Sequence, residues 1–126
     1  MTFWTRRNWM TLAALGGFVA VAVGAFAAHG VHDPKAQEWL RLGSTYGFMH
    51  TMATFACATF MNIGAKRARF APAFFLGGTV IFSGSLYAMA LGAPRWFGVI
   101  TPIGGTLFLV GWGILVWAAR EADPQP

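Results

Sequence analysis

Four long apolar segments divide the chain, and charged residues separate them. Residues 8–28, 42–65, 70–94 and 96–119 contain no Asp, Glu, Lys or Arg. Each segment reaches the ~20 residues that a helix needs to cross the ~30 Å hydrocarbon core of a bilayer. Because unpaired backbone groups are costly in lipid, segments of this kind are expected to be helical. The pattern predicts an all-α integral membrane four-helix bundle with spans at about residues 8–28, 43–64, 71–92 and 101–119.

Proline and capping residues predict where these helices begin. Pro72 and Pro102 fall near the start of the third and fourth segments, where a proline costs no helical hydrogen bond. Thr101 is the expected N-cap of the fourth helix. Asp33 before Pro34 predicts that the second helix starts at about residue 34. That helix would be about 46 Å long, so its first turns are expected to project outward beyond the hydrocarbon.

The composition agrees with a single membrane domain over residues 1–126. Apolar residues make up 56% of the chain and charged residues only 10%, against about 25% charged in soluble domains. The net charge of +5 would favour a nucleic-acid partner if the basic residues shared one face, but they stand in small groups between apolar segments. We therefore expect the bilayer as partner and no nucleic acid. The single cysteine, Cys57, excludes a disulfide within one chain.

The basic residues also predict the orientation of the chain. With four spans, one side of the bilayer receives Arg6, Arg7, Lys66, Arg67, Arg69 and Arg120, and the other receives Lys35, Arg41 and Arg95. Because cytoplasmic loops carry the excess of Lys and Arg, both termini are expected in the cytoplasm. The loop that carries Lys66, Arg67 and Arg69 is the expected contact for anionic lipid headgroups.

The first segment also resembles a secretory signal. Arg6 and Arg7 precede an apolar stretch that ends in Ala25-Phe26-Ala27, an A-x-A-like cleavage site. The stretch is about 21 residues long, against about 7 to 15 in the apolar region of a signal. Cleavage after Ala27 would also leave three further spans rather than a soluble domain. We expect this segment to stay as a membrane helix.

Small residues four positions apart predict where the helices touch. Helices in lipid associate through close approach of their backbones, which Gly and Ala permit. The first and third segments carry such stripes: Gly16, Ala20, Gly24 and Ala28, then Gly84, Ala88 and Gly92.

Polar residues gather toward the outer ends of the predicted spans. His50 is the most informative, because an ionisable side chain inside a span is often functional, and Tyr46 lies one turn before it on the same face. The predicted cluster contains His29, Tyr46, His50, Ser83, Ser85, Tyr87, Arg95 and Thr101.

Three interpretations of this cluster are open. Its members can be hydrogen-bonded groups that hold the helices together, which we prefer. His29 and His50 can instead ligate a haem or a metal, as facing histidines do in helical bundles. The third interpretation is a site for a lipid, a quinone or another small polar ligand. No cofactor is expected under the first interpretation.

The sequence gives little support for an enzyme. The apolar segments contain no Asp or Glu, and the chain contains no Cys-x-x-Cys pair or phosphate-binding glycine motif. No Ser-His-Asp set is recognisable either. An enzyme is therefore the less favoured class.

Several short motifs resemble a known family. They are GAFAAHG at residues 24–30, Tyr46 with His50, FSGSLY at residues 82–87, TPIGG at residues 101–105, and Gly111-Trp112. In this order they are similar to the bacterial YgdD-like family of small four-span membrane proteins and its mitochondrial relatives, Domain of Unknown Function four-two-three. The resemblance implies a multi-pass protein of the bacterial inner membrane with a retained first span and no assigned activity. Family members often have Gln at the position of Gly47, and its loss here argues against an elaborate catalytic network.

Two functions follow from these observations as hypotheses. The first is a structural or accessory subunit that joins a larger membrane complex or self-associates. The alternative is an outer-facing binding protein for a lipid, quinone, haem or metal that uses His29, Tyr46, His50 and Tyr87. A transporter or channel is a third and less favoured hypothesis.

Overall fold

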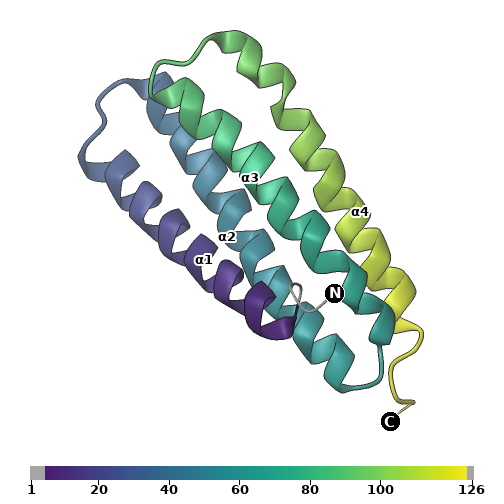
Figure 1. Ribbon diagram of the computed structural model, residues 1–126. Coiled ribbons are helices and arrows are strands. Elements are labelled where there is room, and N and C mark those ends of the chain that lie inside the picture. Colours follow the sequence, from purple (N-terminus) through teal and green to yellow (C-terminus); the bar gives the residue numbers. More distant parts are fainter. Residues whose placement is uncertain (1–4, 125–126) are drawn as a thin grey trace.

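A computed structural model describes residues 5–124, and its regular elements are all helical. Four long helices run antiparallel in chain order (Figure 1): α1 (Arg6–His29), α2 (Pro34–Asn62), α3 (Ala71–Ala90) and α4 (Thr101–Ala119). Two short 3₁₀ helices, η1 (Lys66–Phe70) and η2 (Arg95–Val99), precede α3 and α4. The predicted all-α class is confirmed. Residues 1–4 and 125–126 of the expected domain lie outside the described chain.

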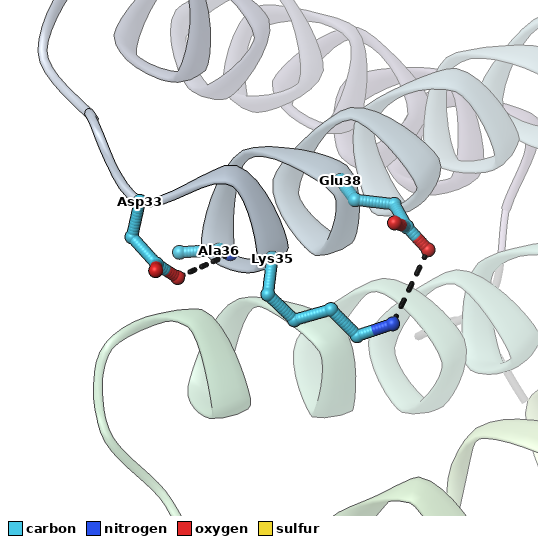
Figure 2. Close-up of polar contacts among 4 residues, drawn as sticks. All are labelled: Asp33, Lys35, Ala36 and Glu38. Carbon is cyan, nitrogen blue, oxygen red and sulfur yellow. Dashed lines mark hydrogen bonds and ion pairs between the residues drawn. The ribbon is translucent and has the colours of Figure 1, made fainter.

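Asp33 sets the start of α2, as its place before Pro34 predicts. Its carboxylate accepts a hydrogen bond from the backbone N–H of Ala36 at 2.9 Å, as Figure 2 shows. Such a cap satisfies one of the amides that the first turn of a helix leaves unpaired. One turn further on, Lys35 Nζ and Glu38 Oε1 form an exposed ion pair at 3.4 Å.

The start of α4 differs from the expectation. The cap position is Ile100, whose backbone is already helical, and no side chain caps the helix. Because η2 runs almost directly into α4, Thr101 is the first residue of the helix rather than its N-cap. The N-cap prediction for Thr101 is therefore wrong.

The helices pack as an open row. Each helix packs against its neighbours in the sequence, whereas no described residue of α1 approaches α4. The contact between α1 and α3 is slight, because both pack against α2. The predicted bundle is therefore open on the side where α1 and α4 would meet in a closed one.

The contact between α1 and α2 uses small residues of α1. A methyl group on Gly16 would overlap the methyl of Thr51, and one on Gly24 would lie 3.1 Å from Ser44 Oγ. The Ser44 hydroxyl donates to the carbonyl of Ala20 at 2.6 Å. Three members of the predicted stripe thus face α2.

The remaining members of the predicted stripes lie elsewhere. Ala28 is exposed and Ala27 is buried instead, because a helical turn is 3.6 residues and a spacing of four drifts around the axis. Gly84 and Gly92 have no neighbouring atom within 4 Å of an added Cβ. Ala88 is half-buried. Within the described chain, the close contacts of α3 are therefore made by other residues.

The contact between α3 and α4 brings backbones together. A Cβ on Gly104 would lie 2.5 Å from the backbone nitrogen of Phe82 and 2.8 Å from the carbonyl oxygen of Gly78. Two turns further along α4, Gly111 makes room for the ring of Phe75. Glycine is thus required where α4 crosses α3.

Among residues 5–124, three helical segments are long and apolar enough to cross a membrane: Arg6–His29, Lys66–Ala90 and Arg95–Ala119. α2 is not among them. It lies between α1 and α3 and buries polar side chains there, including His50, Thr51 and Thr54. A helix covered by other helices needs a less apolar surface than one that faces lipid on most sides.

Candidate functional site

His50 is the centre of the predicted cluster and is almost fully buried. Only 2% of its surface is exposed. Its ring stacks on Phe108 of α4 with 3.5 Å between ring centres and 4° between planes. Phe75 of α3 packs at 5.7 Å from the imidazole. The side chain thus joins α2 to both α3 and α4.

Both ring nitrogens of His50 make hydrogen bonds. Trp112 Nε1 lies 3.0 Å from His50 Nε2, and because an indole N–H can only donate, Nε2 must accept. Nδ1 lies 2.7 Å from the carbonyl oxygen of Tyr46, so it must carry the proton and donate. These two bonds fix a neutral imidazole in the Nδ1–H tautomer. Neither nitrogen then has a lone pair available for a metal.

Tyr46 lies beside His50, as their spacing of four residues predicts. The two rings are nearly parallel, with centres 6.3 Å apart. Tyr46 also packs against Phe82 of α3 at 5.1 Å, and 38% of its surface is exposed. The tyrosine therefore lies at the edge of the buried cluster.

The polar residues of α3 point to two different helices. Ser83 donates to the carbonyl of Gly43 in α2 at 2.6 Å, and the ring of Tyr87 packs close to Gly43. Ser85 instead forms a hydrogen bond with Thr101 of α4 at 2.5 Å. Because each residue advances about 100° around a helix, Ser83 and Ser85, two residues apart, point in nearly opposite directions and cannot face the same partner. The predicted cluster is therefore divided into separate helix-to-helix hydrogen bonds.

His29 lies far from His50. It is the last residue of α1 and is exposed. Thr51 packs against Gly16, so His50 is level with the middle of α1, thirteen residues or roughly 20 Å along the axis from His29. His29 and His50 are therefore too far apart to ligate one haem or metal, and that alternative does not fit the structure. The antiparallel pairing of α1 and α2 separates them.

Arg95 belongs to the connection between α3 and α4 rather than to the His50 cluster. Its guanidinium lies 5.7 Å from the centre of the Trp39 ring, on the outer turns of α2. Lys35 lies over the same ring at 5.6 Å. These contacts join η2 to the start of α2.

The predicted cluster leaves out Trp112, which completes the His50 site, although Trp112 is part of a motif shared with the family. It is eleven residues into α4, whereas membrane tryptophans concentrate at the interfaces. An indole so deep in a predicted span needs an acceptor for its N–H. The deep position of Trp112 therefore indicates a buried hydrogen-bond acceptor nearby, although the sequence does not show which acceptor the indole reaches.

The basic residues of η1 point in two directions, one toward the C-terminal end of α4 and the other toward α1. Arg67 turns toward the C-terminal end of α4: its backbone N–H donates to Glu121 Oε1 at 2.8 Å, and its guanidinium lies 4.3 Å from the centre of the Trp117 ring. Lys66 and Arg69 are exposed on the other side, toward α1. Arg6 of α1 joins them by donating to Asn62 Oδ1 at 2.6 Å.

Known proteins resemble this chain over nearly its whole length. The profile of a protein family of unknown function (DUF423) matches residues 23–105. A UPF0382 membrane protein of Haemophilus influenzae is 44% identical over 120 residues, which cover 93% of this chain and 97% of the relative. The UPF0382 inner membrane protein YgdD of Escherichia coli is 37% identical over 119 residues, or 91% of each chain.

A staphylococcal protein is also similar to this chain. A UPF0382 membrane protein of Staphylococcus epidermidis is 36% identical over 113 residues, which cover 87% of this chain and 93% of the relative. No solved structure matches the chain. The relatives are named as membrane proteins, which is consistent with the long apolar helices of this chain. The chain belongs to the DUF423 family of membrane proteins, whose activity is uncharacterised.

Proposed function

We propose that this protein is a non-catalytic accessory protein of the bacterial inner membrane that crosses the bilayer four times and joins other membrane chains, or further copies of itself. One observation carries the proposal. Among residues 5–124, every buried side-chain nitrogen or oxygen has a hydrogen-bond partner within the protein. The polar groups inside the helices are therefore engaged in packing, with none held ready for a substrate.

The course of the chain supports four spans. α1 and α3 both pack antiparallel to α2, so they point in the same direction (Figure 1). If α1 and α3 each cross the bilayer, the chain must return between them. α2 is the connecting element, and its 29 residues span about 43 Å, which is enough for the crossing.

The distribution of basic residues between the two ends of the helix row supports an orientation in the membrane. The bond between Arg6 and Asn62 and the bond between Arg67 and Glu121 place the start of α1, η1 and the end of α4 at one end. Six of the nine basic residues lie there. An excess of Lys and Arg favours the cytoplasmic side, so both termini are cytoplasmic. Green fluorescent protein fused to either terminus should fluoresce, and fluorescence from only one fusion contradicts the four spans.

The outward face of α4 is the surface we assign to association. Leu109 and Val116 are 73% and 71% exposed, and Gly105 and Gly113 have no atom within 4 Å of an added Cβ. At 100° per residue these four share one face of the helix, opposite the face that packs on α3. Glycine allows a second helix to approach closely in lipid.

The test is Gly113→Leu, compared with Gly77→Leu on α3. Both glycines have open space beside them, so neither leucine should disturb the fold. Gentle detergent extraction followed by native mass spectrometry should recover the wild type and Gly77→Leu with a second chain, and Gly113→Leu without it. A wild type recovered only as a single chain would overturn the accessory role.

A further inference from the structure

The loose contact between α1 and α3 leaves a groove whose floor is α2. Its inner part has a volume of about 660 Å³ and lies between residues 6–12 of α1 and residues 70–80 of α3. A second part of about 360 Å³ continues outward to Ser83 and Tyr87. Leu12, Leu76 and Val80 line both parts, so the groove is continuous along the helices.

The groove is apolar along its length and basic at one end. Beyond Arg6 and Arg69, the residues that line its inner part are all uncharged: Trp9, Leu12, Met61, Phe70, Ala73, Leu76, Gly77 and Val80. At the mouth, Arg6, Lys66 and Arg69 surround a recess of about 430 Å³ together with Met61 and Asn62. None of the described residues that line this recess has a carboxylate, so none of them offsets the charge of the three cations.

Two of the three cations, Arg6 and Arg69, are held by hydrogen bonds within the protein. Asn62 fixes the Arg6 guanidinium, and Arg69 donates to the backbone carbonyl of Lys66 at 3.3 Å. Each bond uses one of the five N–H groups of a guanidinium. The others remain suited to a phosphate, which arginine binds in a bidentate way.

The dimensions of the inner groove match one leaflet of a bilayer. From Phe70 to Val80 the α3 wall extends about 15 Å, at 1.5 Å per residue. The hydrocarbon core of a bilayer is ~30 Å thick, so half of it has the same depth. A lipid whose headgroup sits at the mouth could therefore lay an acyl chain along the inner groove.

From this geometry we propose that the α1–α3 groove binds one anionic phospholipid of the cytoplasmic leaflet, with its phosphate between Arg6, Lys66 and Arg69 and an acyl chain against Leu12, Leu76 and Val80. Arg67 takes no part, because Glu121 and Trp117 hold it on the other side of η1. The site adds lipid recognition to the proposed accessory role, and it lies in the α1–α3 groove rather than on the outward face of α4 assigned to association.

The first experiment tests the headgroup. Purified protein is exchanged into an equimolar mixture of phosphatidylglycerol and phosphatidylethanolamine with identical chains, and native mass spectrometry measures which lipid stays bound. The wild type should retain phosphatidylglycerol preferentially. The Arg6→Gln/Arg69→Gln variant should lose that preference by about fivefold for each arginine removed. The Arg7→Gln/Arg120→Gln variant removes the same charge at the same end without touching the groove, and should behave as the wild type.

The second experiment tests the groove. Gly77→Leu fills the inner part, whereas Gly113→Leu adds the same side chain on α4 outside it. Only Gly77→Leu should abolish retention of phosphatidylglycerol, with the thermal stability of both variants checked in detergent. Equal retention of the two lipids, an equal loss in both arginine pairs, or retention that survives Gly77→Leu would each overturn the proposal.

Two other occupants give different results. Displacement of phosphatidylglycerol by inorganic phosphate would indicate a site for a free anion, and a dimer that only Gly77→Leu disrupts would indicate a second copy in the groove. Either result overturns the lipid site. Failure of the lipid site leaves the effect of Gly113→Leu on association unchanged, so it is distinguishable from failure of the accessory role.

Discussion

Among single side chains, the hydrogen bond between Trp112 and His50 links the outer helix of the row to its interior. Trp112→Phe keeps an aromatic ring but removes the N–H, which leaves His50 Nε2 buried without a donor. The cost of an unsatisfied buried group is about 1–3 kcal/mol, and interhelical hydrogen bonds in membranes average only ~0.6 kcal/mol. We expect the free energy of unfolding, measured by titration with sodium dodecyl sulfate in mixed micelles, to fall by roughly 1–2 kcal/mol.

Trp96→Phe is the matched control for this change. Trp96 lies in η2, is 61% exposed and packs against Phe97, so the same substitution there removes no buried bond. Its effect on unfolding should be small. If the two variants lose equal stability, the bond to His50 contributes nothing measurable and the packing interpretation of His50 loses its main support.

The sequence predicts only the local part of this site. Tyr46 and His50 share a face because helical periodicity places residues four apart together. Trp112 lies sixty-two residues from His50, and no periodicity connects two helices. Their meeting depends on how α4 is rotated against α2 and α3, which is set by the packing of Gly104, Phe108 and Gly111.

Between elements, the closest backbone approach occurs where Gly104 of α4 crosses α3. The atoms that an added methyl would meet belong to the backbone of Phe82 and Gly78, so they cannot move without shifting a helix. Gly104→Ala is therefore expected to separate α3 from α4 and to lower the free energy of unfolding by about 1–3 kcal/mol, as overpacked cores do.

The adjacent Gly105 supplies the control for Gly104→Ala. It has open space beside its Cα, so Gly105→Ala should leave packing intact when the protein is measured as a single chain in detergent, with no second helix on the outward face of α4. Removing a glycine from a helix interior is expected to add about 0.5–1 kcal/mol. The two neighbouring substitutions should thus shift the unfolding midpoint in opposite directions, and a shift in the same direction would show that the α3–α4 crossing is looser than described.

The two predicted stripes of small residues illustrate what spacing can and cannot predict. On α1 three of the four stripe residues face α2, because α2 is the main neighbour of α1. α3 packs against α2 and α4 and also lines the groove that it forms with α1, so several of its faces carry glycine. Gly78 faces α4, whereas Gly77 and Gly84 line the groove. Spacing predicts that glycines share a face, but the neighbours of the helix decide which face is covered.

In the molecule as a whole, α1 is attached almost entirely through α2. Because the N-terminus resembles a secretory signal, the question is whether α1 is cleaved off or stays in the mature protein. Ser44 donates to the Ala20 carbonyl, and Gln37 Nε2 donates to the carbonyls of Ala27 and Val31 at 3.1 and 2.7 Å. Cleavage after Ala27 would remove the acceptor of Ser44 and expose that hydroxyl to lipid, where an unsatisfied polar group is costly.

We therefore expect protein extracted from its native membrane to retain α1, because the remaining helices need it to satisfy the polar face of α2. Mass spectrometry of the intact protein checks this directly: the expected mass is close to 13.6 kDa. A form that starts at Ala28 should be degraded or poorly folded when it is expressed on its own. A native protein found without its first 27 residues, yet stable, would mean that another chain replaces α1 beside α2, since Ser44 would still need an acceptor there, whereas Gln37 keeps the carbonyl of Val31.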